Sequence, residues 1–575
     1  MWKPLRFLRP YRAPVLAALS LTFLNALADL YLPNLMARMV DAGVAKGDSG
    51  TILRLGSFML LVALASMGGQ VGATYLSSRI STGYGRDLRR AIFAKVETFT
   101  LGEFDRLGVP TLITRSTNDV TQVQTFVMML FRMMVAAPLM CVGGIVMALS
   151  LDRGLSVVLV AAVPLLLLAL ALIAVRGVAL FKAMQVKLDR LSSVLREALT
   201  GVRVIRAFNR VDSERQRFGE ANRDMTDTAL AAQRTLAMLM PVMMLAMNFT
   251  GLAIVWMGGH RVGAGAIQVG TMMAFLQYGM QILFALMMMS IMFVLLPRAA
   301  VSAGRINEVL AIEPAIQDPA SPHAMEPRAG QIDFKDVVFR YPGAEAPALE
   351  GVSFSALPGQ VTAIVGGTGS GKSTLVNLIP RFHDVESGRI EIDGIDVRQL
   401  RLEDLRGSIG FVPQKAVLFS DTVANNIRYG KDSASDDDVR RAASVAQADG
   451  FVAGLPQGYQ AAVARAGVNL SGGQKQRLAI ARALARRARI YLFDDSFAAL
   501  DFKTEASLRQ ALRDETRDAT VIIVAQRIST VMDADCIVVL DDGKLAGLGK
   551  HDELMRGCPV YREIATSQLS PQEAA

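Results

Sequence analysis

Long apolar runs separated by polar and basic segments dominate the first half of the chain. Six of these runs are close to, or longer than, the roughly 20 residues that a helix needs to cross a bilayer. They cover residues 13–40, 55–76, 133–151, 155–175, 236–258 and 269–297. The pattern therefore predicts an all-α membrane domain with six transmembrane helices over residues 1–312.

The connections between these runs differ in charge, which predicts the orientation of the helices. Residues 176–234 hold twelve Lys or Arg residues, and residues 79–115 are similarly rich. The turns at 152–154 and 258–267 are short and carry few charges. By the positive-inside rule, both chain ends are expected on the cytoplasmic side of the cytoplasmic (inner) membrane. The two basic connections have a helix-forming composition, so the membrane helices are expected to extend well into the cytoplasm.

Three local features of this half need separate interpretation. Residues 1–12 mix four basic residues with Trp2 and other apolar residues, which predicts a short amphipathic helix on the inner membrane surface. Asp29 interrupts the first run at a cost of ~2.5 to 3.5 kcal/mol on insertion scales. It is expected either to face a cavity or partner helix, or to be hydrogen-bonded locally near the outer interface. Residues 271–292 contain seven methionines, which could accept varied apolar ligands or could simply pack or face lipid.

The pattern changes after residue 312. Residues 313–330 contain four prolines, which cannot continue a helix and therefore predict a linker. From residue 331 to residue 575, short β-rich runs alternate with turns and helical stretches. This pattern predicts a separate cytoplasmic α/β domain.

Composition narrows the class of protein. A hydrophobic fraction of 52% with only 20% charged residues is typical of a membrane protein. The net charge of +9 comes largely from residues beside the apolar runs, so a lipid bilayer, and no nucleic acid, is the expected partner. Three cysteines without pairing or metal spacing argue against a disulfide framework or a zinc site.

A glycine-rich segment in the second half predicts a phosphate loop. It follows the apolar run 361–365 and precedes another apolar stretch, so a buried strand is expected to turn through glycines into a helix. Backbone N–H groups would surround the phosphates of a nucleotide, Lys372 would reach the β- and γ-phosphates, and Ser373 would ligate Mg²⁺. An ordinary glycine-rich turn is disfavoured because strand, spacing, Lys and Ser agree. The predicted nucleotide-binding residues are Gly366, Gly367, Thr368, Gly369, Ser370, Gly371, Lys372, Ser373 and Thr374.

Two further stretches carry candidate chemistry. Residues 490–495 read as a buried strand that ends in two carboxylates, with Asp494 in the usual place of the acid that holds Mg²⁺. The stretch Leu470, Ser471, Gly472, Gly473 and Gln474 opens a helix, and its N–H groups make a second phosphate-binding end. One site needs only one such end, so the second is expected to serve another copy of the fold. Tyr341 at a strand end could stack on adenine, although such tyrosines usually only pack.

The phosphate loop, Gln414 in Phe-Val-Pro-Gln, the Leu-Ser-Gly-Gly-Gln stretch and Asp494 together resemble the nucleotide-binding domain of ATP-binding cassette proteins. With six preceding spans, the whole chain resembles an exporter half-transporter. The resemblance implies that Tyr341 stacks on adenine, that Gln414 senses Mg²⁺ and the attacking water, and that Asp501 lies in the loop facing a second subunit. It also implies two cassettes arranged head to tail, and short helices near residues 103–114 and 201–211 that dock on the cassettes.

The sequence departs from this family at two catalytic positions. Asp495 stands where the family has a glutamate that orients or deprotonates water, and Gln526 stands where it has a switch histidine. Aspartate is shorter by one C–C bond, and a misplacement near 1 Å can cost ~10²-fold in rate. Glutamine can hydrogen-bond but cannot titrate. Both residues could be tolerated variants, but their coincidence favours an impaired site.

The chain therefore resembles the degenerate half of a heterodimeric, multidrug-exporter-like bacterial pair. Its expected partner is a second half-transporter that carries the catalytic Glu and the switch His. Its expected activity is ATP hydrolysis coupled to export of an amphipathic drug, lipid or peptide. A nucleotide-gated regulatory or channel-like subunit, and a homodimeric exporter, remain alternatives.

Overall fold

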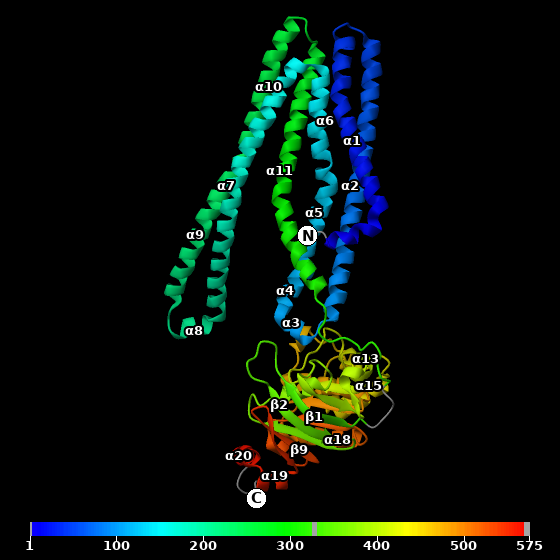
Figure 1. Ribbon diagram of the computed structural model, residues 1–575, viewed down its shortest axis with the longest axis vertical. Helices are drawn as coiled ribbons and strands as arrows, with labels where there is room; N and C mark the ends of the chain where they lie inside the picture. Colours follow the sequence, from blue (N-terminus) through cyan, green and yellow to red (C-terminus); the bar gives the residue numbers. More distant parts are fainter. Residues whose placement is uncertain (1–2, 325–329, 569–575) are drawn as a thin grey trace. The chain divides into compact units, whose positions relative to one another are not determined.

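The structure is a computed structural model that describes residues 3–324 and 330–568, apart from the side chains of residues 290, 291, 293 and 294. Trp2, part of the predicted N-terminal amphipathic helix, lies outside the described residues. So does Pro327, one of the four prolines of the predicted linker. The chain divides into two compact units. The first contains Met1–Glu97 and Val109–Ile312, and the second contains Thr98–Gly108 and Glu313–Ala575. The first unit is helical and the second is built from sheets and helices (Figure 1).

Within the described residues, six helical stretches of the first unit are long and apolar enough to cross a membrane, which confirms the predicted number. They are Pro4–Val44, Ser49–Glu97, Val109–Leu151, Arg153–Thr200, Val211–Gly263 and Val269–Met289. A bilayer core needs only about 20 helical residues. Stretches of 49 and 48 residues therefore continue as helix through the basic connections, as predicted.

Shorter elements make up these stretches, and three of them, η2, η3 and η4, are π-helical. The predicted N-terminal amphipathic helix is present from residue 3 onward as the 3₁₀ helix η1, which contains Pro10. The elements are η1 (Lys3–Tyr11), α1 (Arg12–Arg38), η2 (Met39–Val44), α2 (Ser49–Glu97), α4 (Val109–Thr114), η3 (Arg115–Asp119), α5 (Val120–Met129), η4 (Leu130–Met134), α6 (Ala136–Leu151), α7 (Arg153–Thr200), α8 (Val202–Ala207), α9 (Val211–Ala237), α10 (Leu239–Gly263) and α11 (Val269–Ala311).

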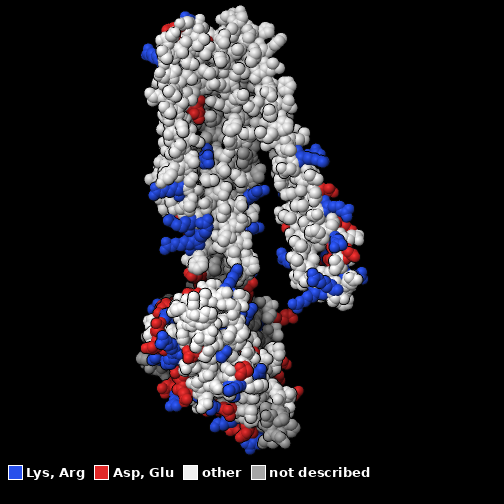
Figure 2. Space-filling view, turned by 180° about the vertical axis from the view of Figure 1, so that it is seen from behind, with Lys and Arg blue, Asp and Glu red and all other residues white. Residues whose placement is uncertain are grey.

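Helix α11 packs against α6, α1 and α10, while α7 and α9 run side by side and are joined by α8 (Figure 1). Fully buried Phe275 and Tyr278 anchor α11 in the membrane core. Because a buried hydroxyl needs a partner, the Tyr278 hydroxyl donates to the carbonyl oxygen of Leu30 at 2.8 Å. Figure 2 shows charged side chains gathered on the helical extensions and sparse over the rest of the first unit on the face drawn. This distribution fits apolar spans with basic flanks.

The second unit contains a six-stranded sheet with the order β10-β9-β3-β8-β7-β6 and a four-stranded sheet with the order β2-β1-β4-β5. In the larger sheet β3 pairs in parallel with β8 and β9, and β7 pairs in parallel with β6 and β8. The strands are β1 (Ile332–Phe339), β2 (Leu349–Ala356), β3 (Val361–Gly366), β4 (Ser387–Ile392), β5 (Ile395–Asp396), β6 (Ile409–Val412), β7 (Ile490–Asp494), β8 (Thr520–Val524), β9 (Cys536–Asp541) and β10 (Lys544–Gly549).

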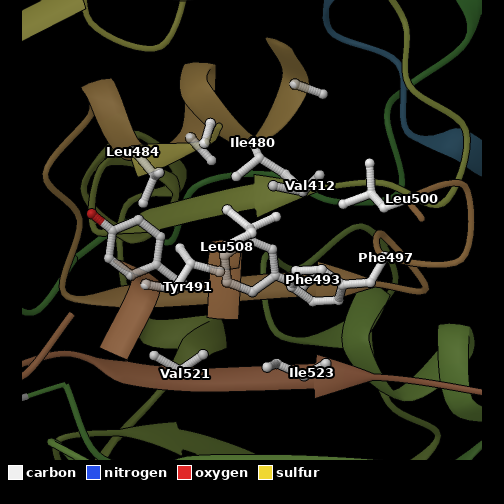
Figure 3. Close-up of a cluster of buried hydrophobic side chains, with 14 of the residues drawn as sticks. Val412, Ile480, Leu484, Tyr491, Phe493, Phe497, Leu500, Leu508, Val521 and Ile523 are labelled. Atoms are coloured by element: carbon white, nitrogen blue, oxygen red, sulfur yellow. The ribbon is translucent and has the colours of Figure 1, made fainter. Parts of the chain in front are cut away.

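The second unit also contains helices, several of which pack against the larger sheet. They are α12 (Lys372–Leu378), η5 (Val397–Gln399), α13 (Leu402–Gly407), α14 (Val423–Arg428), α15 (Asp436–Val445), α16 (Asp449–Ala453), η6 (Gly458–Gln460), η7 (Arg465–Gly467), α17 (Gly472–Ala485), α18 (Phe502–Glu515), η8 (Ile528–Thr530), α19 (His551–Gly557) and α20 (Pro559–Gln568). Alternate residues of one strand point to opposite faces of a sheet. Tyr491 and Phe493 of β7 accordingly join the core with Ile480 and Leu508 of α17 and α18 (Figure 3), whereas Leu492 joins the core on the other face. Burial on both faces explains why these strands read as continuous apolar runs.

The two predicted docking helices belong to different units. Helix α3 (Leu101–Leu107) lies in the second unit, where Glu103 Oε1 accepts a hydrogen bond from the Ala315 backbone at 3.2 Å. Glu103 also completes a capping box with Thr100 at the start of this helix. Helix α8 belongs to the first unit. The chain's own cassette therefore holds one of the two helices as part of its compact unit.

Candidate functional site

The predicted phosphate loop lies between β3 and α12, so the strand, turn and helix expected from the sequence are present. A Cβ atom at Gly366 would meet the carbonyl oxygen of Leu540 at 2.2 Å, and one at Gly371 would meet that of Ala348 at 2.7 Å. Gly371 also has a φ of 95°, in the left-handed region that favours glycine. Lys372 Nζ lies over the loop, 2.9 Å and 2.6 Å from the carbonyl oxygens of Gly366 and Gly367. The loop is a tight cradle of backbone with one amine, which fits polyphosphate.

Two hard oxygen donors meet beside this loop. Ser373 Oγ donates to Asp494 Oδ1 at 2.9 Å, although the two residues are 121 positions apart in the chain. The parallel arrangement of β3, β8 and β7 brings the end of β7 to the loop. A hydroxyl and a carboxylate at this position would hold Mg²⁺ together with phosphate oxygens and water. The donor set therefore fits the predicted ion.

The two residues that depart from the family pattern contact each other. Gln526 Nε2 donates to Asp495 Oδ2 at 2.7 Å, and Gln414 Nε2 donates to the same oxygen at 3.2 Å. Asp495 follows β7 directly and has a φ of 47°, which is uncommon outside glycine, asparagine and aspartate. One oxygen of the Asp495 carboxylate thus accepts hydrogen bonds from two side-chain amides, neither of which can gain or lose a proton.

Burial changes the proton affinity of the charged groups in this site. It raises the pKa of Asp494 and the pKa of Asp495 above their ordinary value, and it lowers the pKa of Lys372. Each shift disfavours the charged form of a group that the protein partly or wholly removes from water. A divalent cation beside the carboxylates and a polyphosphate beside the amine would offset these costs. The electrostatics therefore agree with the geometry.

Tyr341 lies just after β1, and its side chain is only partly exposed. Its hydroxyl is 3.0 Å from Thr374 Oγ1 of the phosphate loop. Its ring meets Phe339 and His383 edge-on, with centroids 4.8 Å and 5.5 Å away. The tyrosine therefore stands beside the loop, where its ring face could stack on a base.

The Leu-Ser-Gly-Gly-Gln stretch is separate from the phosphate loop within this chain. Ser471 caps α17, and Gln474 completes a capping box: Ser471 Oγ accepts from Gln474 N at 3.3 Å, and Gln474 Oε1 accepts from Ser471 N at 2.9 Å. No hydrogen bond between described residues joins 470–474 to the phosphate loop. A Cβ atom at Gly473 would lie 3.1 Å from the carbonyl oxygen of Ala499, so this stretch packs against the loop that ends at Asp501. Asp501 itself caps α18 by accepting from Thr504 N at 2.9 Å.

Comparison with known proteins identifies the family. Residues 15–287 match the model of the ABC transporter transmembrane region, and residues 349–498 match the ABC transporter model. The chain is 46% identical to an uncharacterized ABC transporter ATP-binding protein of Mycobacterium tuberculosis, over 98% of this chain and 97% of that protein. This chain belongs to the ATP-binding cassette transporter family. It is also 35% identical to a fatty acid ABC transporter ATP-binding/permease protein of the same species, over 83% of this chain and 75% of that protein.

The ABC transporter chain also has the fold of an exporter. A solved structure of a bacterial Atm1-family ABC exporter with ATP bound is 29% identical to it, with a TM-score of 0.80, and the match covers 96% of this chain and 97% of that chain. An N-terminal helical membrane domain followed by a C-terminal ABC ATPase domain is the architecture of an exporter half-transporter. ATP-driven transport is therefore the activity of the family to which it belongs.

Two residues of the cassette have positions that the sequence interpretation missed. Glu505 on α18 is 3% exposed and accepts a hydrogen bond from Thr530 Oγ1 at 2.6 Å. Thr530 follows Gln526 by four residues in the sequence. The sequence does contain a signal for Glu505. Its spacing from Leu508 and Leu512 places it on the apolar face of the helix, where an acidic side chain without a partner is costly. Gln568 gave no local signal. Its side chain donates to the carbonyl oxygen of Gln526 at 2.9 Å and accepts from the backbone N–H of Ile528 at 2.9 Å.

Gln568→Ala is expected to loosen the segment that carries Gln526. The two lost hydrogen bonds contribute about 1 kcal/mol each, so amide hydrogen exchange at Ile528 should become up to about 30-fold faster. Gln568→Glu keeps an acceptor for Ile528 N and should give a smaller increase. Gln510→Ala, an exposed position on α18, serves as the control. Unchanged exchange at Ile528 in Gln568→Ala would show that this contact does not position the segment.

The membrane domain of this ABC transporter contains a cavity of about 930 Å³. Asp29 lines it and accepts a hydrogen bond from Ser66 of α2 at 2.9 Å. Of the two alternatives for Asp29, the structure therefore shows the first, a side chain that faces a cavity or a partner helix. The methionine-rich segment has side chains in two environments. Met280 and Met288 line the cavity, whereas others such as Met287 pack in the membrane core.

Proposed function

We propose that this chain is one subunit of a heterodimeric ABC exporter. Its own ATP site binds Mg²⁺ and ATP but hydrolyses ATP slowly, and its Leu-Ser-Gly-Gly-Gln stretch completes the competent site of the partner. That partner is a second half-transporter with glutamate and histidine at the two positions where this chain has Asp495 and Gln526. The cargo is an amphipathic compound that leaves across the cytoplasmic membrane, with both chain ends on the cytoplasmic side.

The observation that carries this proposal is the contact between Asp495 and Gln526. The carboxylate that should act on water accepts from Gln526 at 2.7 Å and from Gln414 at 3.2 Å, through the same oxygen. An aspartate is also shorter than a glutamate by one C–C bond, and a displacement near 1 Å can cost ~10²-fold. Gln526 cannot take up positive charge near the transferred phosphate as a histidine can. Both changes reduce the catalytic power of this site without removing its phosphate loop.

The residues for binding nucleotide are all retained. Lys372 and the loop N–H groups would hold the phosphates, Ser373 and Asp494 would hold Mg²⁺, and Tyr341 would stack on adenine. Mg²⁺ would supply charge neutralisation on the phosphates. With the carboxylate engaged and displaced, these residues bind ATP but do not activate water efficiently. ATP at this site would act as a clamp that favours the closed pair.

The surface around the intact Leu-Ser-Gly-Gly-Gln stretch supports a second subunit. Val468 is 76% exposed on one side of Ser471, and Phe502, next to Asp501, is 73% exposed. Phe208, at the end of α8 between two predicted spans, is 76% exposed. Large apolar side chains outside the bilayer region favour a covering partner. These positions are the ones at which a facing half-transporter would contact this chain.

The cargo assignment rests on the cavity and on one relative. Apolar and methionine side chains with a few polar groups line the cavity, which fits an amphipathic ligand. The Mycobacterium tuberculosis relative whose name includes fatty acid transport supports a lipid-like member of this class.

ATPase rates of the purified chain and of the pair test the proposal. In nanodiscs of the same lipid, the pair should hydrolyse ATP at least ~10²-fold faster than this chain alone. The single chain should still bind Mg-ATP, as measured by equilibrium binding of a fluorescent ATP analogue. Fast hydrolysis by the single chain as a dimer of identical copies would contradict the assignment.

A further inference from the structure

The cavity of the membrane domain has both an acidic and a basic side chain in its wall. Elements α1, α2, η4 and α11 contribute to it, and its volume of about 930 Å³ is at the upper end of the ~300 to 1,000 Å³ typical of ligand pockets. Asp29 and Arg132 both line it. Charged residues within membrane spans are costly and usually serve a ligand or a partner. The cavity therefore has a defined electrostatic preference.

The acidic side of the cavity is built from α1 and α2. The hydroxyl of Ser66 donates to Asp29 Oδ1 at 2.9 Å and also contacts Asn25 Oδ1. Asn25 Nδ2 in turn donates to Gln70 Oε1 at 3.0 Å. Gln281 on α11 donates to the Asp29 backbone at 3.1 Å, while its own Oε1 is buried with no hydrogen-bond partner among the described residues. The group has more acceptors than donors, so it favours a cationic hydrogen-bond donor such as an ammonium group.

The basic side of the cavity is Arg132. It lies on η4 (Leu130–Met134), a π-helical turn between α5 and α6, and such turns are rare and are often found at functional sites. Among the described residues, Arg132 has neither an ion-pair partner nor a hydrogen-bond partner. Its guanidinium presents several donors in a planar fork that matches phosphate or carboxylate. The arginine is therefore available to an anionic group of a ligand.

The remaining wall is largely apolar. Met129, Met133, Met140 and Met247 line it together with Phe284. Methionine side chains are flexible and polarizable, so they adapt to alkyl chains of different shape. A ligand with a hydrocarbon tail would therefore bury its tail against this part of the wall.

We propose that this cavity binds a zwitterionic amphiphile, with its ammonium group at Asp29, its phosphate or carboxylate at Arg132 and its tail along the methionine wall. A neutral ligand would leave both charges unpaired in a region of low dielectric constant, and a singly charged ligand would leave one unpaired. Only a ligand with both charges satisfies both sides. The transport role of this site rests on the proposed function, whereas the head-group preference rests on the cavity alone.

Binding of four probes to the pair in nanodiscs tests this preference. Three share one tail and differ in head group: tetradecylphosphoethanolamine is zwitterionic, tetradecylammonium is cationic and tetradecyl phosphate is anionic. The fourth, free phosphoethanolamine, carries both charges without a tail. Below micelle-forming concentrations, tetradecylphosphoethanolamine should bind about ten-fold tighter than either the cationic or the anionic probe, because one extra charge-assisted hydrogen bond is worth at least ~1.4 kcal/mol. Free phosphoethanolamine should not bind measurably, which separates a lipid-like ligand from a soluble zwitterion.

Two variants assign the head group to its side chains. Arg132→Gln should weaken tetradecylphosphoethanolamine binding about ten-fold and leave binding of the cationic probe unchanged or tighter. Asp29→Asn should do the reverse, with the anionic probe unchanged or tighter. Arg38→Gln, at the end of α1 and outside the cavity, is the matched control and should leave the affinities of all four probes unchanged.

Equal affinity for the three tailed probes, or an unchanged preference in both variants, would overturn the inference. These results do not depend on ATP hydrolysis. A pair that prefers the zwitterion but hydrolyses ATP no faster than the single chain would contradict the proposed function alone. A pair with the expected hydrolysis and no head-group preference would contradict the inference alone.

Discussion

Asp495→Glu together with Gln526→His is expected to raise ATP hydrolysis at this chain's own site about 10²-fold. The longer glutamate carries its carboxylate forward by one C–C bond, and replacing Gln526 removes the nearer of the two amide donors to this carboxylate, which lies at 2.7 Å. The histidine adds a group that can carry positive charge. The rate is best measured in the pair with Ser471→Ala in this chain, because that change suppresses the partner's site and leaves the turnover of this one visible.

Controls separate catalysis from folding in this experiment. Asp495→Asn with Gln526→His has the same backbone and no carboxylate, so it should stay slow. Asp495 has a φ of 47°, which glutamate tolerates less well than aspartate, so thermal unfolding should be compared for all variants. If the double variant is folded and is as slow as the unmodified chain, these two residues do not explain the impaired site.

Ser471→Ala is expected to lower hydrolysis by the pair about 10²-fold. The serine hydroxyl would donate to the γ-phosphate held by the partner, and loss of one such donor to developing charge costs ~10² to 10³ in kcat. The substitution also removes an N-cap from α17, which costs about 1 kcal/mol in stability. The measurement is the ATPase rate of the pair in nanodiscs at saturating Mg-ATP.

The chain offers a matched control for the cap. Ser435 caps α15 through the same arrangement, in which its side chain accepts from Asp438 N and Asp438 completes the box. Ser435→Ala should therefore cost similar stability while leaving the rate of the pair within about two-fold. If Ser471→Ala and Ser435→Ala have equal effects on the rate, the Leu-Ser-Gly-Gly-Gln stretch does not serve a site in the partner.

The features predicted correctly from the sequence depend on local pattern. A run of apolar residues longer than about 20 indicates a span whatever surrounds it, and the phosphate loop needs only a strand, glycines and a following helix. Ser373 and Asp494 could be assigned to the same ion because each stands in the usual place of its motif, one in the phosphate loop and the other at the end of a buried strand. The membrane half was harder in detail. Pro10 and the neighbouring residues form a 3₁₀ helix, and the π-helical turn at Arg132 left no clear mark in the sequence.

The features that the sequence could not give are contacts between distant side chains. Gln568 holds the segment of Gln526 across 42 positions, and no periodicity links the two. Asp29 was recognised as costly, but its presence with Arg132 in the wall of one cavity depends on how α1, α2 and η4 pack. The contact between Asp495 and Gln526 was likewise invisible, although each departure from the family pattern could be read singly. Long-range packing therefore decides how the recognised residues act together.

The most direct test of the central claim identifies the nucleotide at each site during turnover. The pair is incubated with a photoreactive, radiolabelled ATP analogue and Mg²⁺, cross-linked, and separated into its two chains, and the bound nucleotide is identified on each. The account predicts intact triphosphate on this chain, at the loop of Lys372, and mainly diphosphate on the partner. Diphosphate in equal amounts on both chains would contradict the account, because this chain's site would then hydrolyse ATP as readily as its partner's.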